Sequence, residues 1–189
     1  MNLNNDIKNI LVSNEQIEAR CKELALEIDR DYDGKKPILL SLLRGSIPFV
    51  TTLSKYITIP IEFDYMKASS YRGGTHSTGN VAVTVLPASN LEGRHVIVVE
   101  DIVDTGFTLS TVMKMLKDLK PASLEIASLL DKPTMRKVND LSIKYLGLNF
   151  DISSSLSLMS SSISYSLTSD FLSPSDFFLN SVERYVVLW

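Results

Sequence analysis

The sequence predicts an α/β fold: a mainly parallel, twisted sheet flanked by helices on both faces. Two segments, residues 37–53 and 96–117, each combine an apolar strand, a glycine-containing turn and a helix. A third apolar stretch, residues 123–130, follows the second helix and predicts another parallel strand. Strands that alternate with helices build a sheet covered on both faces, so we expect a binding site at the carboxyl ends of the strands.

The first predicted helix begins at Ser13. Ser13 and Gln16 have the spacing of a capping box, in which each side chain bonds to the backbone N–H of the other residue. The helix is expected to end before Asp33 and Gly34. Its apolar face includes Cys21, the only cysteine of the chain, which we interpret as a small core residue.

The next strand and helix are predicted at residues 37–43 and 47–53, joined by a turn that contains Arg44 and Gly45. A guanidinium fork and exposed backbone amides in such a turn are suited to bind diphosphate. A solvated arginine in a Gly-Ser turn is nevertheless the commoner case. The turn alone therefore does not decide between a diphosphate-binding arginine and a solvated one.

Two further strands are predicted at residues 59–66 and 81–85. The residues between them, 67–79, are rich in glycine, serine and threonine. A plain hairpin connection is one interpretation of this segment. Connections of this length are more often functional, typically as a mobile lid.

The second strand–turn–helix unit carries most of the functional information. Residues 96–99 form an apolar strand that ends in Glu100 and Asp101, followed by Asp104 and a Thr-Gly-Phe-Thr turn that opens a helix over 109–117. A phosphate can bind at such a helix start, because the first backbone N–H groups have no partner within the helix and the helix dipole favours an anion.

The acidic residues around this turn have two interpretations. Asp104 and Thr105 are residue types that cap helices. However, three carboxylates and two threonines around Gly106 exceed what a cap needs, because crowded acids repel one another. Glu100 and Asp101 are then expected to hold sugar hydroxyls or Mg²⁺, and Asp104 to lie beside the reactive carbon of the sugar. Gly106 allows a close approach to the backbone.

Composition and motif content argue against several other classes. The chain has 189 residues, which fits one domain, and its net charge of -3 offers no general attraction for nucleic acid. The motifs G-x-x-x-x-G-K-[ST] and G-x-G-x-x-G do not occur, which argues against a nucleoside triphosphatase or a dinucleotide enzyme. Residues 1–6 lack a secretory core, and no run of about 18 apolar residues occurs. We therefore predict a cytoplasmic protein with no membrane or nucleic-acid partner.

At residues 96–109 the chain resembles the type I phosphoribosyltransferases, whose PRPP-binding signature is a strand, two adjacent acids, a third aspartate and a T-G-x-T loop. Other segments are similar to the hypoxanthine-guanine members of that family, and the resemblance covers residues 14–151. It implies a phosphoribosyltransferase-type fold with a small hood region, in a homodimer or homotetramer. It also implies purine salvage: transfer of 5-phosphoribose from PRPP to hypoxanthine or guanine, giving IMP or GMP and diphosphate, with Mg²⁺ as cofactor.

The resemblance assigns roles to the matching residues. Glu100 and Asp101 would hold the ribose diol and Mg²⁺, and Asp104 would be the catalytic general base that takes the purine N7 proton. The residues expected to cradle the 5-phosphate are Asp104, Thr105, Gly106, Phe107 and Thr108. Those expected to contact diphosphate are Leu43, Arg44 and Gly45. The mobile loop carries Ser70 and Tyr71, which would close over the reacting centre and exclude water.

Lys132 is the predicted specificity residue. A lysine after a strand is usually solvated, but Ser128-Leu129-Leu130-x-Lys132-Pro133 resembles the family segment whose lysine donates a hydrogen bond to the 6-oxo group of hypoxanthine or guanine. An ammonium group has only donors, so this contact would separate oxopurines from adenine.

After residues 146–151 the chain departs from the family pattern. Twelve of the 23 positions in 153–175 are serine, which indicates a low-complexity segment that is either disordered or adds a strand. We therefore divide the chain into a phosphoribosyltransferase core, residues 1–151, and a divergent serine-rich C-terminal segment, residues 152–189, which the resemblance would place in the hood.

The divergent segment leaves several interpretations open. Residues 183–187 resemble the base-stacking segment of the family, which implies Tyr185 and Val186 as purine contacts; an apolar C-terminal strand is the alternative. Two other functions also remain open. One is a regulator of the same fold that binds PRPP or a nucleotide without transfer. The other is a transferase for another base, such as xanthine or a pyrimidine.

Overall fold

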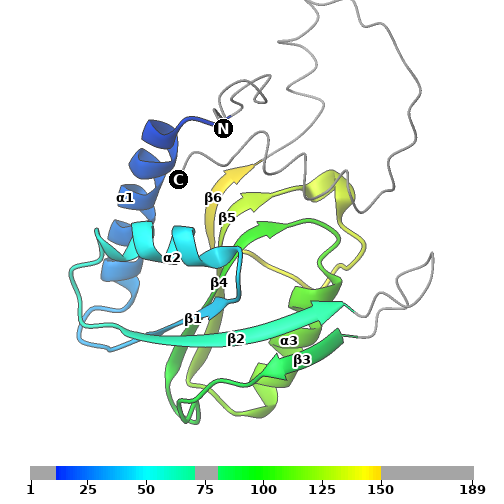
Figure 1. The fold of residues 1–189 in the computed structure, drawn as a ribbon. Coiled ribbons are helices and arrows are strands. Elements are labelled where there is room, and N and C mark those ends of the chain that lie inside the picture. Colours follow the sequence, from blue (N-terminus) through cyan, green and yellow to red (C-terminus); the bar gives the residue numbers. More distant parts are fainter. Residues whose placement is uncertain (1–11, 71–80, 150–189) are drawn as a thin grey trace, which may run out of the picture. The chain divides into compact units, whose positions relative to one another are not determined.

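The computed structural model describes residues 12–70 and 81–149 (Figure 1). The chain divides into one unit of residues Arg20–Asp151, which holds the sheet, and another of Met1–Ala19 with Ile152–Trp189. The predicted hood therefore lies outside the described residues. The elements in chain order are α1 (Asn14–Asp31), β1 (Ile38–Leu42), α2 (Ser46–Ser54), β2 (Glu62–Ser70), β3 (Val81–Val85), β4 (His95–Val103), α3 (Phe107–Asp118), β5 (Ser123–Asp131), the short 3-10 turn η2 (Pro133–Met135) and β6 (Tyr145–Asn149).

The sheet has six strands in the order β3-β2-β1-β4-β5-β6. All neighbouring strands pair in parallel except β3, which runs antiparallel to β2 at one edge. The pairing places Ser41 of β1 opposite Val99 of β4, and Val103 of β4 opposite Asp131 of β5. The carboxyl ends of β1, β4 and β5 therefore meet at one edge of the sheet, as the sequence predicts.

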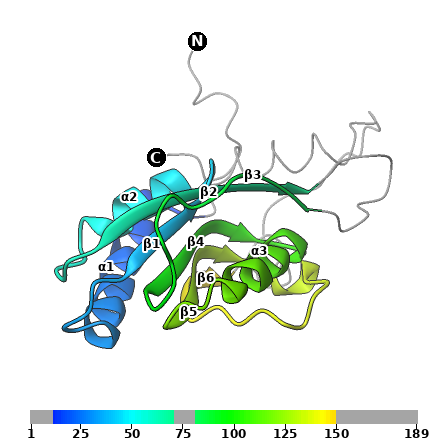
Figure 2. The ribbon, with the colours of Figure 1, turned by 90° about the horizontal axis from the view of Figure 1, so that it is seen from below.

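Helices cover both faces of the sheet. Alternate residues of β1 and β4, among them Ile38, Leu40 and Val98, belong to one buried cluster with Val112 and Leu116 of α3. Residues between them point to the other face, where α2 packs against β1 and β4. Figure 2 shows α2 and α3 on opposite sides of the sheet, which confirms the predicted fold class.

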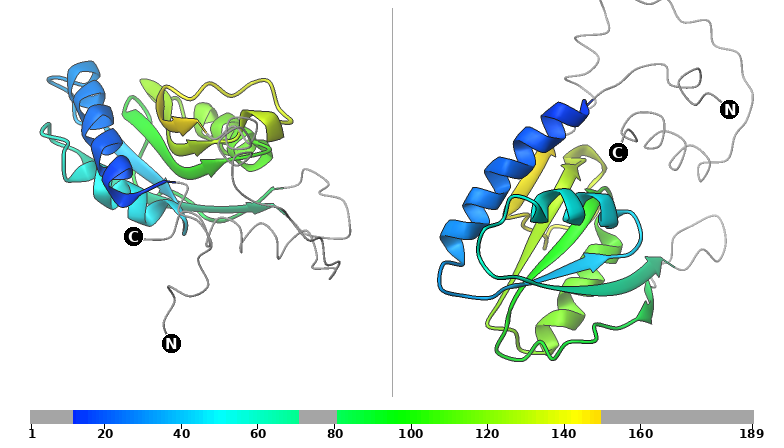
Figure 3. Two further views of the ribbon diagram at one scale, coloured as in Figure 1. Left: turned by 90° about the horizontal axis from the view of Figure 1, so that it is seen from above. Right: turned by 60° about the vertical axis from the view of Figure 1, so that its left-hand side comes forward.

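The start of α1 confirms the predicted capping box. The backbone N–H of Ser13 donates to Gln16 Oε1 at 2.8 Å, and that of Gln16 donates to Ser13 Oγ at 3.3 Å. The helix ends at Asp31, before the Asp-Gly turn, and Cys21 is fully buried. From Arg20 onward α1 lies beside the edge strand β6 (Figure 3), because the Arg20 guanidinium donates to the carbonyls of Leu146 and Gly147.

Three strands differ from the sequence prediction. Strand β4 continues through Glu100 and Asp101 to Val103, and β2 continues to Ser70, so residues 67–70 of the predicted connection belong to a strand. Strand β2 begins at Glu62 rather than at residue 59, because the backbone N–H groups of Thr58 and Ile59 bond to the Asp29 carboxylate at the end of α1 instead of to a strand. Strand β6 was not predicted. Its Gly147 lies so close to β5 that a β-carbon would be 2.3 Å from the Leu129 carbonyl oxygen, and a glycine inside a short strand weakens the sequence signal.

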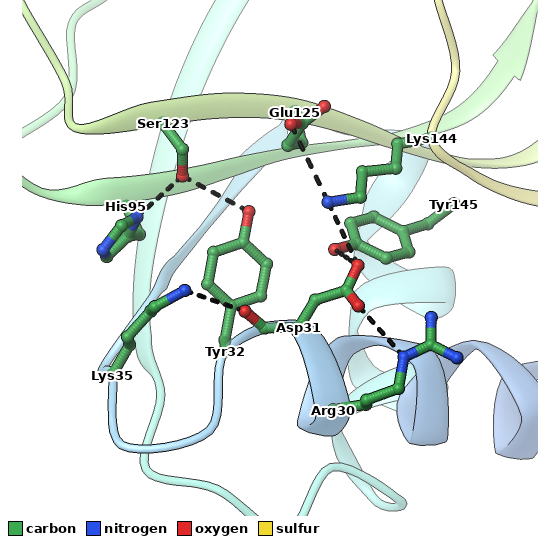
Figure 4. A network of polar contacts seen from close by, with 9 residues as sticks. All are labelled: Arg30, Asp31, Tyr32, Lys35, His95, Ser123, Glu125, Lys144 and Tyr145. Atoms are coloured by element: carbon green, nitrogen blue, oxygen red, sulfur yellow. Dashed lines mark hydrogen bonds and ion pairs between the residues drawn. The ribbon is translucent and has the colours of Figure 1, made fainter.

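A polar network ties the end of α1 to the amino ends of β4, β5 and β6 (Figure 4). The Tyr145 hydroxyl donates to Asp31 Oδ2 at 3.0 Å, and Lys144 Nζ lies 3.0 Å from the same oxygen. His95 Nδ1 lies 2.8 Å from the Ser123 hydroxyl. Since these residues begin or precede strands, the network lies at the edge of the sheet opposite the predicted site, where it stabilises the fold. Among the residues that the structure describes, no helix is long and apolar enough to cross a membrane.

Candidate active site

The loop after β1 and the acidic end of β4 lie in direct contact. A β-carbon built on Gly45 would lie 2.0 Å from Asp101 Oδ2 and 2.7 Å from its Cγ. The backbone φ of Gly45 is −57°, which any residue can adopt, so the missing side chain matters here for space and not for conformation. The predicted diphosphate loop and the predicted sugar-binding acids are thus brought together.

The loop after β1 is held by the start of the next helix. The Leu43–Arg44 peptide bond is cis, and α2 begins at Ser46, immediately after Gly45. The buried Ser46 hydroxyl lies 2.7 Å from the Ser41 hydroxyl and also hydrogen-bonds to the Leu42 carbonyl. Arg44 itself is exposed. A guanidinium on a fixed turn beside the start of a helix can meet an anion.

The acids at the end of β4 form a crowded group. Burial raises the pKa of Glu100 well above its ordinary range, and a side-chain hydrogen bond and the charge of Asp101, together with the charge of Asp104, raise it further. The Asp101 N–H donates to Glu100 Oε1 at 3.2 Å, which opposes the shift only in part. Such a group favours a bound proton or a cation.

The donor chemistry of this acidic pair fits Mg²⁺. Carboxylate oxygens are the ligands that this ion prefers, and it commonly binds one or two carboxylates while phosphate and water oxygens complete its shell. Within residues 12–70 and 81–149, no group of three or more histidine, cysteine or acidic side chains is arranged to hold a metal. Glu100 and Asp101 could supply one or two carboxylate ligands to such an ion.

The loop after β4 turns directly into α3. The N-cap residue is Gly106, so neither Asp104 nor Thr105 occupies the capping position. Instead, the Asp104 carboxylate accepts a 2.5 Å hydrogen bond from the Thr105 N–H and lies 3.4 Å from the Thr105 hydroxyl. Asp104 and Thr105 are half-buried, which leaves both accessible to a ligand at the helix start.

Position 106 requires a glycine, both for its backbone conformation and for the small space that its neighbours leave. Its φ is +81°, a conformation that side chains rarely adopt, and a β-carbon would lie 2.6 Å from Val138 Cγ2 and 2.9 Å from Leu141 Cδ1. The segment that follows β5 therefore packs closely against this glycine, and the approach of a phosphate to its backbone stays a prediction. This neighbour is distant in sequence, so the loop pattern alone could not indicate it.

The segment after β5 completes the strand-end edge. Lys132 follows β5 directly, is half-buried, and its backbone N–H donates to the Val103 carbonyl at 2.9 Å. Four residues later the Arg136 guanidinium contacts the Asp104 carbonyl and pairs with Asp131. Arg136 and Asp131 were not predicted as site residues; the available signal in the sequence was an acid that ends a strand and an arginine five residues later.

Three predicted site residues cannot be placed. Tyr71, Tyr185 and Val186 lie outside the described residues. Ser70 is the last residue of β2, which runs parallel to β1, so its backbone points towards the same edge of the sheet as the other predicted residues.

Known proteins resemble this chain over most of its length. A family model described as "Phosphoribosyl transferase domain" matches residues 8–150. A hypoxanthine-guanine phosphoribosyltransferase of Streptococcus pneumoniae is 48% identical over 136 residues, which are 72% of this chain and 76% of that protein. The enzyme of the same name from Staphylococcus aureus is 41% identical over 145 residues, 77% of this chain and 80% of the relative.

Solved structures agree with the sequence relatives. A hypoxanthine phosphoribosyltransferase from Staphylococcus aureus superposes with a TM-score of 0.75 at 40% identity, covering 80% of this chain and 83% of that one. A hypoxanthine-guanine phosphoribosyltransferase from Bacillus anthracis gives a TM-score of 0.72 at 40% identity, covering 76% and 85%. The relatives named above are phosphoribosyltransferases for hypoxanthine, or for hypoxanthine and guanine. The chain therefore belongs to the phosphoribosyltransferase family.

Proposed function

We propose that this protein transfers 5-phosphoribose from PRPP to N9 of hypoxanthine or guanine, releasing diphosphate and forming IMP or GMP in purine salvage. The observation that carries the proposal is the contact between Gly45 and Asp101, which joins the loop after β1 to the acids that end β4. PRPP has a diphosphate and a 5-phosphate on one sugar, so its site needs two anion-binding loops with a polyol-binding group between them.

Glu100 and Asp101 would bind the ribose diol and hold Mg²⁺. Their carboxylate oxygens can accept hydrogen bonds from both sugar hydroxyls. When bound, Mg²⁺ neutralises charge on the phosphate oxygens of the ligand. The crowding of Glu100 by Asp101 and Asp104 supports this role, because a cation would counterbalance the charges of these acids.

The 5-phosphate would lie at the start of α3. The backbone N–H groups of Gly106, Phe107 and Thr108 would bind it there together with the hydroxyls of Thr105 and Thr108, while the N–H of Thr105 donates to Asp104. On the opposite side of the acids, Leu43, Arg44 and Gly45 would contact the diphosphate. Binding both ends of PRPP fixes the sugar between them and orients its reactive carbon towards the purine.

Asp104 would take the N7 proton as the purine attacks through N9. Its carboxylate is oriented by the Thr105 N–H at 2.5 Å, so it is already fixed before a substrate enters. By family resemblance the transition state has oxocarbenium character, and catalysis then depends on positioning and on charge stabilisation. Lys132 would donate to the 6-oxo group and select oxopurines.

Other parts of the proposal rest on the sequence alone. The lid residues Ser70 and Tyr71 and the purine contacts Tyr185 and Val186 stay predictions, as do the boundary at residue 151, the cytoplasmic location and the homodimer or homotetramer. The relatives, named hypoxanthine-guanine phosphoribosyltransferases, do not favour a non-catalytic regulator or a transferase for another base.

The test is product formation by the full chain. Purified protein is incubated with PRPP and each of hypoxanthine, guanine, xanthine and uracil, with and without Mg²⁺, and IMP, GMP, XMP and UMP are quantified. The proposal predicts Mg²⁺-dependent IMP and GMP. Binding of PRPP without any product would favour the regulator, and XMP or UMP as the main product would favour another base.

A further inference from the structure

Three consecutive backbone carbonyls at the catalytic loop are bonded by one segment. The carbonyls of Val103 and Thr105 accept hydrogen bonds from the backbone N–H groups of Lys132 and Lys137, at 2.9 and 3.0 Å. The carbonyl between them, that of Asp104, accepts a 3.2 Å hydrogen bond from Arg136 Nε. The central bond of the three thus depends on a side chain, while the outer two are backbone bonds that tolerate substitution.

The Arg136 guanidinium is fixed on its other side by the sheet. Its Nη2 donates to Asp131 Oδ1, and both side chains are only 15% exposed. Asp131 is the last residue of β5 and lies opposite Val103 of β4 in the sheet. The ion pair is therefore anchored to the strand pair that carries the loop, and its low exposure limits screening by solvent.

The geometry of one peptide unit carries this restraint to the Asp104 carboxylate. The Asp104 carbonyl and the Thr105 N–H belong to the same planar peptide and point in opposite directions. Arg136 holds the carbonyl, and the N–H donates to Asp104 Oδ1 at 2.5 Å. Rotation of this peptide would break both hydrogen bonds together, so the guanidinium sets the orientation of the carboxylate.

We infer that Arg136, held by Asp131, is a positioning residue for Asp104. The inference rests on the proposed function, in which Asp104 is the general base. It also couples the two halves of the purine site, because the segment that carries Lys132 is the one that orients Asp104. A planar guanidinium suits this role, since it donates in two fixed directions at once, whereas a lysine ammonium does not.

The test is a double-mutant cycle in the full chain, with Arg136→Met, Asp104→Asn and the combined variant. We expect Arg136→Met to lower kcat for IMP formation roughly 10- to 100-fold, because an error of about 1 Å in a catalytic group has an effect of that order. The KM values for hypoxanthine and PRPP should change by less than about threefold, because the ground-state contacts remain. In the Asp104→Asn background, the same substitution should lower kcat by less than about threefold.

Arg20→Met is the matched control. The Arg20 guanidinium also donates to two backbone carbonyls and pairs with a carboxylate, that of Glu23, and its side chain is 24% exposed. It lies on α1 against β6, outside the strand-end loops. Arg20→Met should lower the midpoint of urea unfolding but leave kcat unchanged. Arg136→Lys, which retains a charge beside Asp131, replaces Arg136→Met in the cycle if the methionine variant does not fold, with the same expected outcome.

Wild-type kcat in the Arg136 variants would overturn the inference, and so would an equal loss of kcat with and without the Asp104 carboxylate. Either result leaves the proposed function standing, provided that the wild-type chain forms IMP and Asp104→Asn forms it much more slowly. If the wild-type chain forms no product from any base, the proposed function fails first and the inference with it.

Discussion

Gly45 and Asp101 approach each other so closely that a β-carbon at position 45 would lie 2.0 Å from the Asp101 carboxylate. The two residues are 56 positions apart and lie on different strand-end loops. Their contact brings two separate strand–turn–helix units together at one edge of the sheet.

Gly45→Ala tests this contact. Because Gly45 has a φ of −57°, alanine is allowed by the backbone and the substitution acts mainly by displacing the Asp101 carboxylate. We expect kcat/KM for PRPP to fall roughly 10- to 100-fold, with a change in unfolding free energy below about 1 kcal/mol. Steady-state kinetics and urea unfolding measure the two effects.

Gly34→Ala is the control for Gly45→Ala. Gly34 has a φ of +67° but no atom within 4 Å of a β-carbon, so alanine there strains the backbone without displacing a neighbour. It should lower stability and leave kcat/KM unchanged. Full activity of Gly45→Ala would show that the Asp101 position is not important for PRPP binding.

Asp104→Asn tests the general base. The amide keeps the size of the side chain but cannot accept a proton, so kcat should fall roughly 10²- to 10⁴-fold while PRPP affinity stays close to that of the wild type. Single-turnover rates and PRPP titration separate the two quantities. Asp140→Asn is the control, because this exposed carboxylate accepts hydrogen bonds from Ser110 at 2.8 and 2.9 Å but does not contact the strand-end acids. An unchanged rate in Asp104→Asn would remove Asp104 from the mechanism.

Lys132→Ala tests purine selection. The side chain is proposed to donate to the 6-oxo group, so its removal should raise the KM for hypoxanthine and guanine by about tenfold or more, the effect of one lost hydrogen bond to a charged group. The KM for PRPP should change little. If only PRPP affinity falls in this variant, the lysine contacts the phosphorylated substrate and the assignment is wrong.

The hydrogen bonds of Asp64 predict how the stability of the folded protein depends on pH. This buried carboxylate accepts hydrogen bonds from the backbone N–H groups of Tyr65, Ala88 and Ser89 at 2.7, 3.2 and 2.7 Å. Burial raises its pKa, but these hydrogen bonds outweigh burial, so the net pKa lies below its ordinary value of 3.8. A lowered pKa stabilises the folded state above the unfolded pKa, and this contribution is lost as the pH falls through the folded pKa.

Asp64→Asn should therefore destabilise the protein by about 1–3 kcal/mol at pH 7, with a smaller difference from wild type below the ordinary carboxyl pKa. Urea unfolding between neutral pH and acid measures the change. Glu92→Gln, an exposed carboxylate in the same connection between β3 and β4, is the control and should behave like the wild type. A constant difference across this pH range would contradict the assigned hydrogen bonds.

The elements that sequence predicts correctly are those with local causes. The capping box depends on Ser13 and Gln16, which are three residues apart. The strand–turn–helix unit around Gly106 is formed by one continuous segment of the chain. Parallel topology then brings the ends of β1, β4 and β5 to one edge. This is why the positions of Gly45, Asp101 and Lys132 at one edge could be predicted without coordinates.

The parts that sequence misses depend on distant partners. Strand β2 starts late because Asp29 binds the backbone of Thr58, and β6 is recognised as a strand only from its pairing with β5. Arg136 gains its role from the Asp104 carbonyl, 32 positions away. Local sequence periodicity does not indicate such contacts, because each contact forms only when the folded sheet brings distant segments together.

The most direct test of the central claim is a crystal structure of the full chain with PRPP and Mg²⁺. We expect the 5-phosphate at residues 105–108 at the start of α3, the ribose hydroxyls on Glu100 and Asp101, and the diphosphate against residues 43–45. A ligand bound elsewhere, or bound with its 5-phosphate away from the start of α3, would contradict these assignments.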